Sequence, residues 1–179
     1  MAKTGLSVFF VLLAVVTALE VEAEKPDAAS GLILDPEKMV ASIYDAVSSE
    51  AGSTPDWSVV RGFFDPDAVI VLRASREESK KFDVDGFIQD FVAFYDRIDS
   101  ETTGFVETVV SVKTLEYGNI AHSYVVYEAS ILGSDRPPQR GLDSWHLMKK
   151  DGRWWVVSVV NDAEPAAGAI PGEVFSERP

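Results

Sequence analysis

The chain has 179 residues, of which 46% are apolar and 25% charged, with 29 acidic side chains against 16 basic ones. The apolar content is enough for a packed core and too high for a disordered chain. A net charge of −13 opposes binding to nucleic acids or anionic membranes. The sequence has no cysteine, which excludes disulfides, thiol catalysis, cysteine-ligated zinc and iron–sulfur clusters.

The first 23 residues have the pattern of a secretory signal peptide. Lys3 precedes an apolar run at 8–19, and Val21 and Ala23 supply the residues around a cleavage site near Ala23. The run is shorter than the roughly 20 residues of a membrane-spanning helix. An uncleaved core helix is the alternative, and the absence of a polar face disfavours it. We therefore predict a secreted or periplasmic protein that is not stably inserted in a membrane after cleavage.

The remaining chain predicts one folded domain. A linker at 24–34 precedes the domain, which covers residues 35–164, and a flexible tail rich in Ala, Pro and Gly follows at 165–179. This size suits a single hydrophobic core.

Three helices are predicted in the first half of the domain. Asp35 is the expected N-cap of a helix with Pro36 in its first turn, and Gly52 ends it. A short helix opens at Asp56, and a third, capped by Asp83, runs to about residue 98. The apolar stripe of the third helix consists of Phe87, Phe91, Phe94, Tyr95 and Ile98.

Strands dominate the rest of the domain. Residues 68–72 read as a buried strand, and the charged stretch at 74–82 as a loop. Longer strands are expected at 105–115, 120–132, 140–150 and 153–160. Asp151-Gly152 is a strong hairpin signal. The pattern predicts an α+β domain with its helices on one face of a curved sheet.

The element order and several motifs resemble the nuclear transport factor 2-like, SnoaL-like superfamily over about residues 37–164. The motifs are FFDPDA at 63–68, YGNIAH at 117–122, YE at 127–128, RGLDS at 140–144 and DGRWWVVS at 151–158. The resemblance implies a cone-shaped, curved antiparallel sheet with the N-terminal helices on its concave face, the cystatin-like α+β barrel, around an apolar pocket. It implies no single activity, because this fold hosts isomerases, cyclases, dehydratases, epoxide hydrolases and binding modules.

The last predicted strand is apolar on both faces. Strict alternation places Trp154, Val156 and Val160 on one face and Trp155, Val157 and Val159 on the other. A sheet with one solvated face would alternate apolar and polar residues. We predict that the outer face is covered in a homodimer, as the resemblance also implies. The alternative is that tail residues 170–175 fold back over it.

Three side chains are candidate catalytic groups. His122 and His146 lie on neighbouring predicted strands, and histidine is a natural general acid or base at neutral pH. Both could instead be surface or hydrogen-bonded structural residues. Asp65, at the mouth of the first strand, is a candidate general base by the resemblance, although Asp-Pro-Asp is also a common turn sequence.

Candidate ligand-binding residues come from the inward faces of the helices and from the last strand. They are Tyr44, Trp57, Phe91, Tyr95 and Asn161. A buried tyrosine can donate its hydroxyl to a developing oxyanion, or can simply be part of the core. The sequence contains no metal- or cofactor-binding motif, so no cofactor is expected.

Three functions remain open at this point. The first, which we favour because each polar candidate also has a structural explanation, is an exported domain that binds a small apolar molecule in the cone, without a known activity. The second is a SnoaL-like acid/base enzyme, an isomerase, dehydratase or cyclase, acting on a small hydrophobic substrate. The third is a protein-interaction or assembly module with a filled cone. The enzyme requires a titratable group in the pocket within hydrogen-bond reach of another polar group.

Overall fold

The structure is a computed structural model that describes residues 35–75, 77–164 and 168–170. The predicted signal peptide, the linker and most of the tail lie outside these residues. The elements in chain order are α1 (Pro36–Ala46), α2 (Trp57–Arg61), β1 (Phe64–Arg73), β2 (Ser79–Phe82), α3 (Val84–Arg97), β3 (Gly104–Tyr117), β4 (Ile120–Leu132), β5 (Gln139–Lys150) and β6 (Arg153–Ala163). Within the described part of the chain, no helix is long and apolar enough to cross a membrane.

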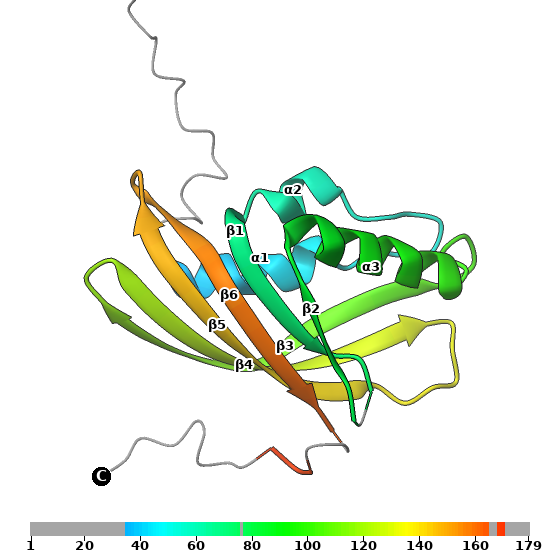
Figure 1. The fold of residues 1–179 in the computed structure, drawn as a ribbon. Coiled ribbons are helices and arrows are strands. Elements are labelled where there is room, and N and C mark those ends of the chain that lie inside the picture. Colours follow the sequence, from blue (N-terminus) through cyan, green and yellow to red (C-terminus); the bar gives the residue numbers. More distant parts are fainter. Residues whose placement is uncertain (1–34, 76, 165–167, 171–179) are drawn as a thin grey trace, which may run out of the picture.

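The strands form a curved, unclosed sheet in the order β2-β1-β6-β5-β4-β3, and the helices gather over its concave side (Figure 1). Neighbouring strands pair antiparallel except β1 and β6, which run parallel. The parallel pair arises because the chain turns back from β1 into β2, crosses through α3 to β3 at the opposite edge, and returns through the meander β3–β6. The predicted α+β architecture is therefore confirmed.

Each of the three helices in the described residues begins at an aspartate cap. The carboxylate of Asp35 accepts the backbone N–H groups of Glu37 and Lys38, and Asp56 and Asp83 cap α2 and α3 in the same way. These caps satisfy amide groups that the first helical turn leaves unpaired. The helix starts were thus predicted correctly, whereas α1 ends at Ala46, well before Gly52.

One predicted loop contains a strand. Residues 79–82 form β2, which pairs antiparallel with β1 at the edge of the sheet. Lys80 and Lys81 lie in this short strand, and charged residues on an edge strand discourage pairing with other chains. The expectation of a loop was wrong because a solvated edge strand has no apolar face to reveal it.

Two β-bulges change which side chains face the core. The register shifts between Val109 and Ser111 in β3, and opposite His146 and Leu147 in β6, where Val157 is the extra residue. Each extra residue moves the following side chains to the opposite face. In consequence Val159 is buried and Val160 is 47% exposed. Strict alternation along β6 was therefore wrong beyond Val157.

The core lies between the concave face of the sheet and the helices. Its fully buried members include Met39 and Val40 of α1, Ile70 of β1, and Trp154 and Val156 of β6. Burying such side chains stabilises the fold by about 1.5–3 kcal/mol each. This packing leaves a gap near the middle strands, where the polar residues described next are found.

Candidate functional site

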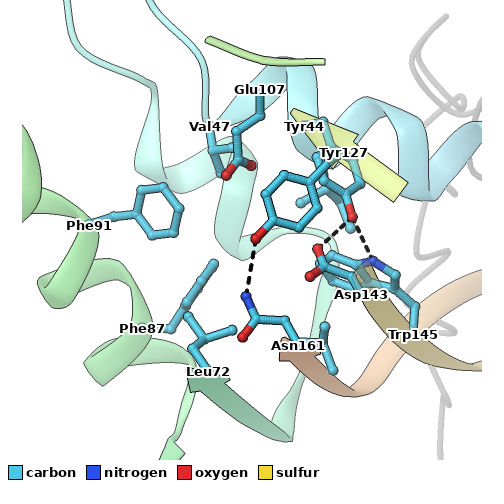
Figure 2. A pocket seen from close by; sticks show the side chains of 12 residues that line it. Tyr44, Val47, Leu72, Phe87, Phe91, Glu107, Tyr127, Asp143, Trp145 and Asn161 are labelled. Atoms are coloured by element: carbon cyan, nitrogen blue, oxygen red, sulfur yellow. Dashed lines mark hydrogen bonds between the residues drawn. The ribbon is translucent and has the colours of Figure 1, made fainter. Parts of the chain in front are cut away.

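A cavity of about 50 Å³ lies between α1, α3 and the concave face of the sheet (Figure 2). Apolar side chains from both helices and from β1 and β6 make up much of its wall. The side chains with hydrogen-bonding groups that reach it are Tyr44, Glu107, Tyr127, Asp143, Trp145 and Asn161. A volume of this size holds about three or four water molecules or a similar number of heavy atoms.

The pairing of the strands brings the polar side chains together. Asp143 of β5 lies directly opposite Asn161 of β6. Tyr127 of β4 lies opposite Gly141, two residues before Asp143 and on the same face of β5. Such direct and diagonal neighbours have side chains within reach of one another. Glu107 joins them from β3, on the other side of β4.

Asp143 is a buried carboxyl group with one committed oxygen and one free oxygen. The Tyr44 hydroxyl donates to its Oδ2 at 2.5 Å, and the indole N–H of Trp145 donates to the Tyr44 oxygen at 3.0 Å. Its Oδ1 has no hydrogen-bond partner among the described residues. Asn161 lies close enough to favour the charged form but directs its amide at Tyr127.

Burial dominates the acidity of Asp143. The side chain is only 7% exposed, and removing a carboxylate from water disfavours its charged form. Burial therefore raises the pKa of Asp143 to about 7, against the opposing hydrogen bond from Tyr44. At neutral pH this group can both accept and release a proton.

Glu107 is a second acidic group in the same cavity. Its backbone N–H donates to the Ser48 hydroxyl at 2.9 Å, which fixes β3 against the end of α1. Burial, and secondly the charge of Asp143, raise the pKa of Glu107 to about 8. The two carboxyl groups thus lose their protons one after the other near neutrality. A pair whose pKa values differ in this way can supply one acid and one base.

Tyr127 supplies a neutral hydroxyl between the two carboxyl groups. Burial and the neighbouring acids raise its pKa well above the usual value, so the phenol keeps its proton. The amide of Asn161 donates to its oxygen at 3.4 Å, which leaves the hydroxyl hydrogen for another acceptor. The ring lies against Gly141, where a Cβ atom would overlap it.

Three of the predicted ligand-binding residues line this cavity, and two lie behind it. Tyr44, Phe91 and Asn161 are in the cavity wall. The ring of Trp57 packs against those of Phe91 and Tyr95, at centroid distances of 6.0 and 5.7 Å. The Tyr95 hydroxyl donates to a backbone carbonyl at the end of α1 at 2.8 Å.

The two histidines lie together on the convex face of the sheet, outside the cavity. His122 and His146 are directly opposed across β4 and β5, with ring centroids 4.4 Å apart. Each forms a hydrogen bond to a serine, His122 to Ser144 at 2.8 Å and His146 to Ser158 at 2.9 Å. Burial, and secondly His146, lower the pKa of His122.

Asp65 also lies away from the cavity. Its carboxylate accepts the backbone N–H of Asp67 at 3.0 Å and lies 3.9 Å from the Lys150 ammonium group. This is the turn geometry that an Asp-Pro-Asp sequence favours. Among the described residues, no three His, Cys, Asp or Glu side chains gather as metal ligands would.

Three residues of the site were not predicted from the sequence: Glu107, Tyr127 and Asp143. Asp143 carried a usable signal, because it shares a strand face with Trp145 and Leu147, both buried and apolar. An acid on such a face is placed inside the cone by alternation alone. Glu107 carried a similar signal, because it alternates along β3 with Phe105, which is buried, and Val109, which packs against the core.

Comparisons with known proteins identify the fold. No family model matches the chain, and no curated protein matches it. An NTF2-like protein with a cystatin-like fold from Novosphingobium aromaticivorans is similar at a TM-score of 0.59 and 9% identity, over 79% of this chain and 86% of that one. A protein of unknown function with a cystatin-like fold from Nostoc punctiforme is similar at a TM-score of 0.57 and 13% identity, over 79% and 96%.

A third similar structure has a different name and the same architecture. It is a putative Ca/calmodulin-dependent kinase II association domain from Exiguobacterium sibiricum, with a TM-score of 0.54 and 10% identity over 78% of this chain and 96% of that one. Likeness at such low identity concerns the fold and not the activity. The chain has the NTF2-like, cystatin-like α+β fold.

Proposed function

We propose that this protein is an acid/base enzyme that moves a proton on a small hydrophobic substrate, as an isomerase, dehydratase or cyclase does. The observation that carries the proposal is the carboxyl group of Asp143, which faces the cavity with Oδ1 unpaired while Tyr44 holds Oδ2. Burying a carboxyl without a full set of partners costs free energy. A pocket that only binds an apolar molecule gains nothing from that cost.

The arrangement suits proton abstraction from a carbon next to a carbonyl group. Asp143 Oδ1 takes the proton, and the C–H electron pair moves into an enolate. The Tyr127 hydroxyl and the protonated Glu107 carboxyl donate hydrogen bonds to the enolate oxygen, where the negative charge develops. Asp143 then returns its proton to another carbon, or Glu107 gives its proton to a leaving hydroxyl group. Tyr44 and Trp145 hold the base in place.

Exchange of carbon-bound hydrogen tests the assignment of the base. The wild-type protein in D₂O is expected to exchange the methyl protons of small methyl ketones such as acetophenone, followed by NMR. Asp143→Asn should slow this exchange by about 100-fold or more, the usual contribution of a general base. Asp65→Asn, which alters a carboxyl outside the cavity, should leave it unchanged. Unchanged exchange in Asp143→Asn, with the ketone still bound, would support a binding protein instead.

The pH dependence tests the pair of acids. The base must be charged and the acid protonated, so the rate should rise as pH approaches 7 and fall above about 8. Glu107→Gln keeps a hydrogen-bond donor that cannot ionise, so the fall on the alkaline side should disappear. An alkaline limb that persists in Glu107→Gln would remove Glu107 from the mechanism.

We also infer that the mature protein is secreted or periplasmic and forms a homodimer through the convex face of the sheet. The signal-peptide pattern at residues 1–23 supports export. Apolar side chains exposed on or beside that face support the dimer, since Leu115 is 62%, Ile120 61% and Tyr117 85% exposed. An assembly module with a filled cone is less well supported, because the cone contains a polar cavity.

A further inference from the structure

A second chamber adjoins the inner cavity. It measures about 230 Å³ and shares Phe91, Glu107 and Tyr127 with the cavity wall. Glu107 and Tyr127, which are proposed to donate hydrogen bonds to the substrate oxygen, therefore lie where the two spaces meet. A molecule longer than the inner cavity can place its head beside Asp143 and the rest of its length in the outer chamber.

The outer chamber has a cationic side chain that is free to bind a ligand. Its wall includes Arg73 and Arg97. Arg73 is committed to Asp162, with Nε–Oδ1 and Nη2–Oδ2 distances of 3.0 and 2.7 Å. Arg97 lies over the Phe94 ring, 5.9 Å from its centroid, and has no ion-pair partner among the described residues.

Arg97 is the charged group of the chamber that remains available to a ligand, because the other ionisable groups there are paired or protonated. The carboxylate of Asp90 lies 3.7 Å from the Lys80 ammonium, which offsets its charge. Glu107 is protonated at neutral pH because its pKa is about 8. Gln139 adds an amide that can donate a hydrogen bond. An anion with a planar fork of oxygens matches a guanidinium group best.

The apolar wall of the chamber suits a flat hydrocarbon body. The rings of Phe94 and Phe105 meet edge to face with centroids 4.8 Å apart, and Phe91 lies 6.3 Å from Phe105. Such a cluster offers ring faces and edges to an aromatic guest. The inner cavity, with room for about three or four heavy atoms, limits the head of that guest to a group the size of an acetyl.

We infer that the substrate is an amphipathic carboxylate, with a small carbonyl head beside Asp143, a flat apolar body against Phe94 and Phe105, and its carboxylate at Arg97. This substrate class rests on the proposed function, since the same head meets the proposed base. On a chain with a net charge of −13, a carboxylate is repelled by most of the surface. Affinity for it must therefore come from the chamber itself.

A matched pair of probes tests the inference. 4-Acetylbenzoate has the acetyl head, the ring and the carboxylate, and 4-acetylbenzamide replaces only the charge. Calorimetry should show that the wild type binds the benzoate about tenfold more tightly, as a hydrogen-bonded charge pair implies. Arg97→Gln should bind the two probes equally. Arg61→Gln, the same change on α2 outside the chamber, should keep the preference.

The Asp143→Asn variant separates this inference from the proposed function. It should keep the preference for the benzoate and lose deuterium exchange at the acetyl methyl group. Equal affinities in the wild type, or a preference that survives Arg97→Gln, would overturn the anion site. A preference without any exchange that depends on Asp143 would uphold the anion site and overturn the enzyme.

Discussion

The burial of Asp143 lowers the stability of the folded protein near neutral pH and gives this side chain the pKa that the proposed reaction needs. Its carboxyl is buried, one oxygen is unpaired, and its pKa of about 7 lies well above the usual 3.8. The folded protein therefore holds this proton more tightly than the unfolded chain does between about pH 4 and pH 7. Stability should fall as pH rises through that range, because the folded state must then bury a charge.

Replacing Asp143 should stabilise the protein while removing the proposed activity. Asp143→Asn keeps an oxygen to accept the Tyr44 hydroxyl but cannot ionise, so the loss of stability toward pH 8 should largely disappear. At pH 8 the variant should be more stable by up to about 3 kcal/mol, and near pH 4 the two proteins should be similar. Urea unfolding at both pH values checks this, with Asp65→Asn as control. A variant less stable than wild type at pH 8 would contradict it.

His122 should have the opposite pH dependence. Burial and the facing His146 ring lower its pKa below the usual 6.5, so the unfolded chain binds this proton more readily. Its ring centroid also lies 4.4 Å from that of Tyr124, and its Nε2 is hydrogen-bonded to the Ser144 hydroxyl at 2.8 Å. Its contribution is fully present above pH 6.5 and is lost as pH falls below that value.

The measurement for His122 is a difference between two proteins. Thermal unfolding of wild type and His122→Asn is compared from pH 7.5 to pH 5, so that other groups cancel. The wild type should lose stability relative to the variant as pH falls. A constant difference across the range would mean that His122 titrates alike in both states.

Strands β4 and β5 hold Tyr127 in the proposed site through a glycine. Gly141 faces Tyr127 across the strand pair, and the phenol ring occupies the space that a Cβ atom would need. Gly141→Ala should push the ring off the β5 backbone, at a cost of about 1–3 kcal/mol in stability. The rate of proton exchange should fall about tenfold or more, because the Tyr127 hydroxyl is then misplaced.

A double-mutant cycle separates this effect from general damage. If Gly141 acts by positioning the Tyr127 hydroxyl, adding Gly141→Ala to Tyr127→Phe should slow the exchange little further. Additive losses in the exchange rate would mean that the glycine acts elsewhere.

Element boundaries were largely readable from the sequence, and side-chain facing was not. The caps at Asp35 and Asp83 and the Asp151-Gly152 turn follow from local chemistry, and both turn residues do adopt positive φ, at 54° and 79°. A bulge inserts one residue of no distinctive type, so the sequence did not indicate that Val110 and Val157 are the extra residues of β3 and β6. Every facing assigned across a bulge was therefore unreliable, as the reversal at Val159 and Val160 shows. Glu107 precedes the bulge in β3, and its facing was readable from its alternation with Phe105 and Val109.

At the scale of the whole molecule, the convex face of the sheet is the proposed dimer interface. If Ile120, 61% exposed, lies in a dimer interface, Ile120→Glu should yield a monomer because it would bury a charge. Light scattering at micromolar concentration should give a dimer for the wild type and for Val59→Glu, a matched change on α2, where Val59 is 50% exposed. A monomeric wild type would rule out the dimer.

The hydrogen bonds from Trp145 through Tyr44 to Asp143 also connect the site to a fluorescent side chain. The excited state of an indole responds to nearby charge, and this indole is one hydroxyl group away from a carboxyl that ionises near neutrality. The fluorescence emission of Trp145 should therefore change when a proton, or the head group of a ligand, reaches the Asp143 carboxyl group.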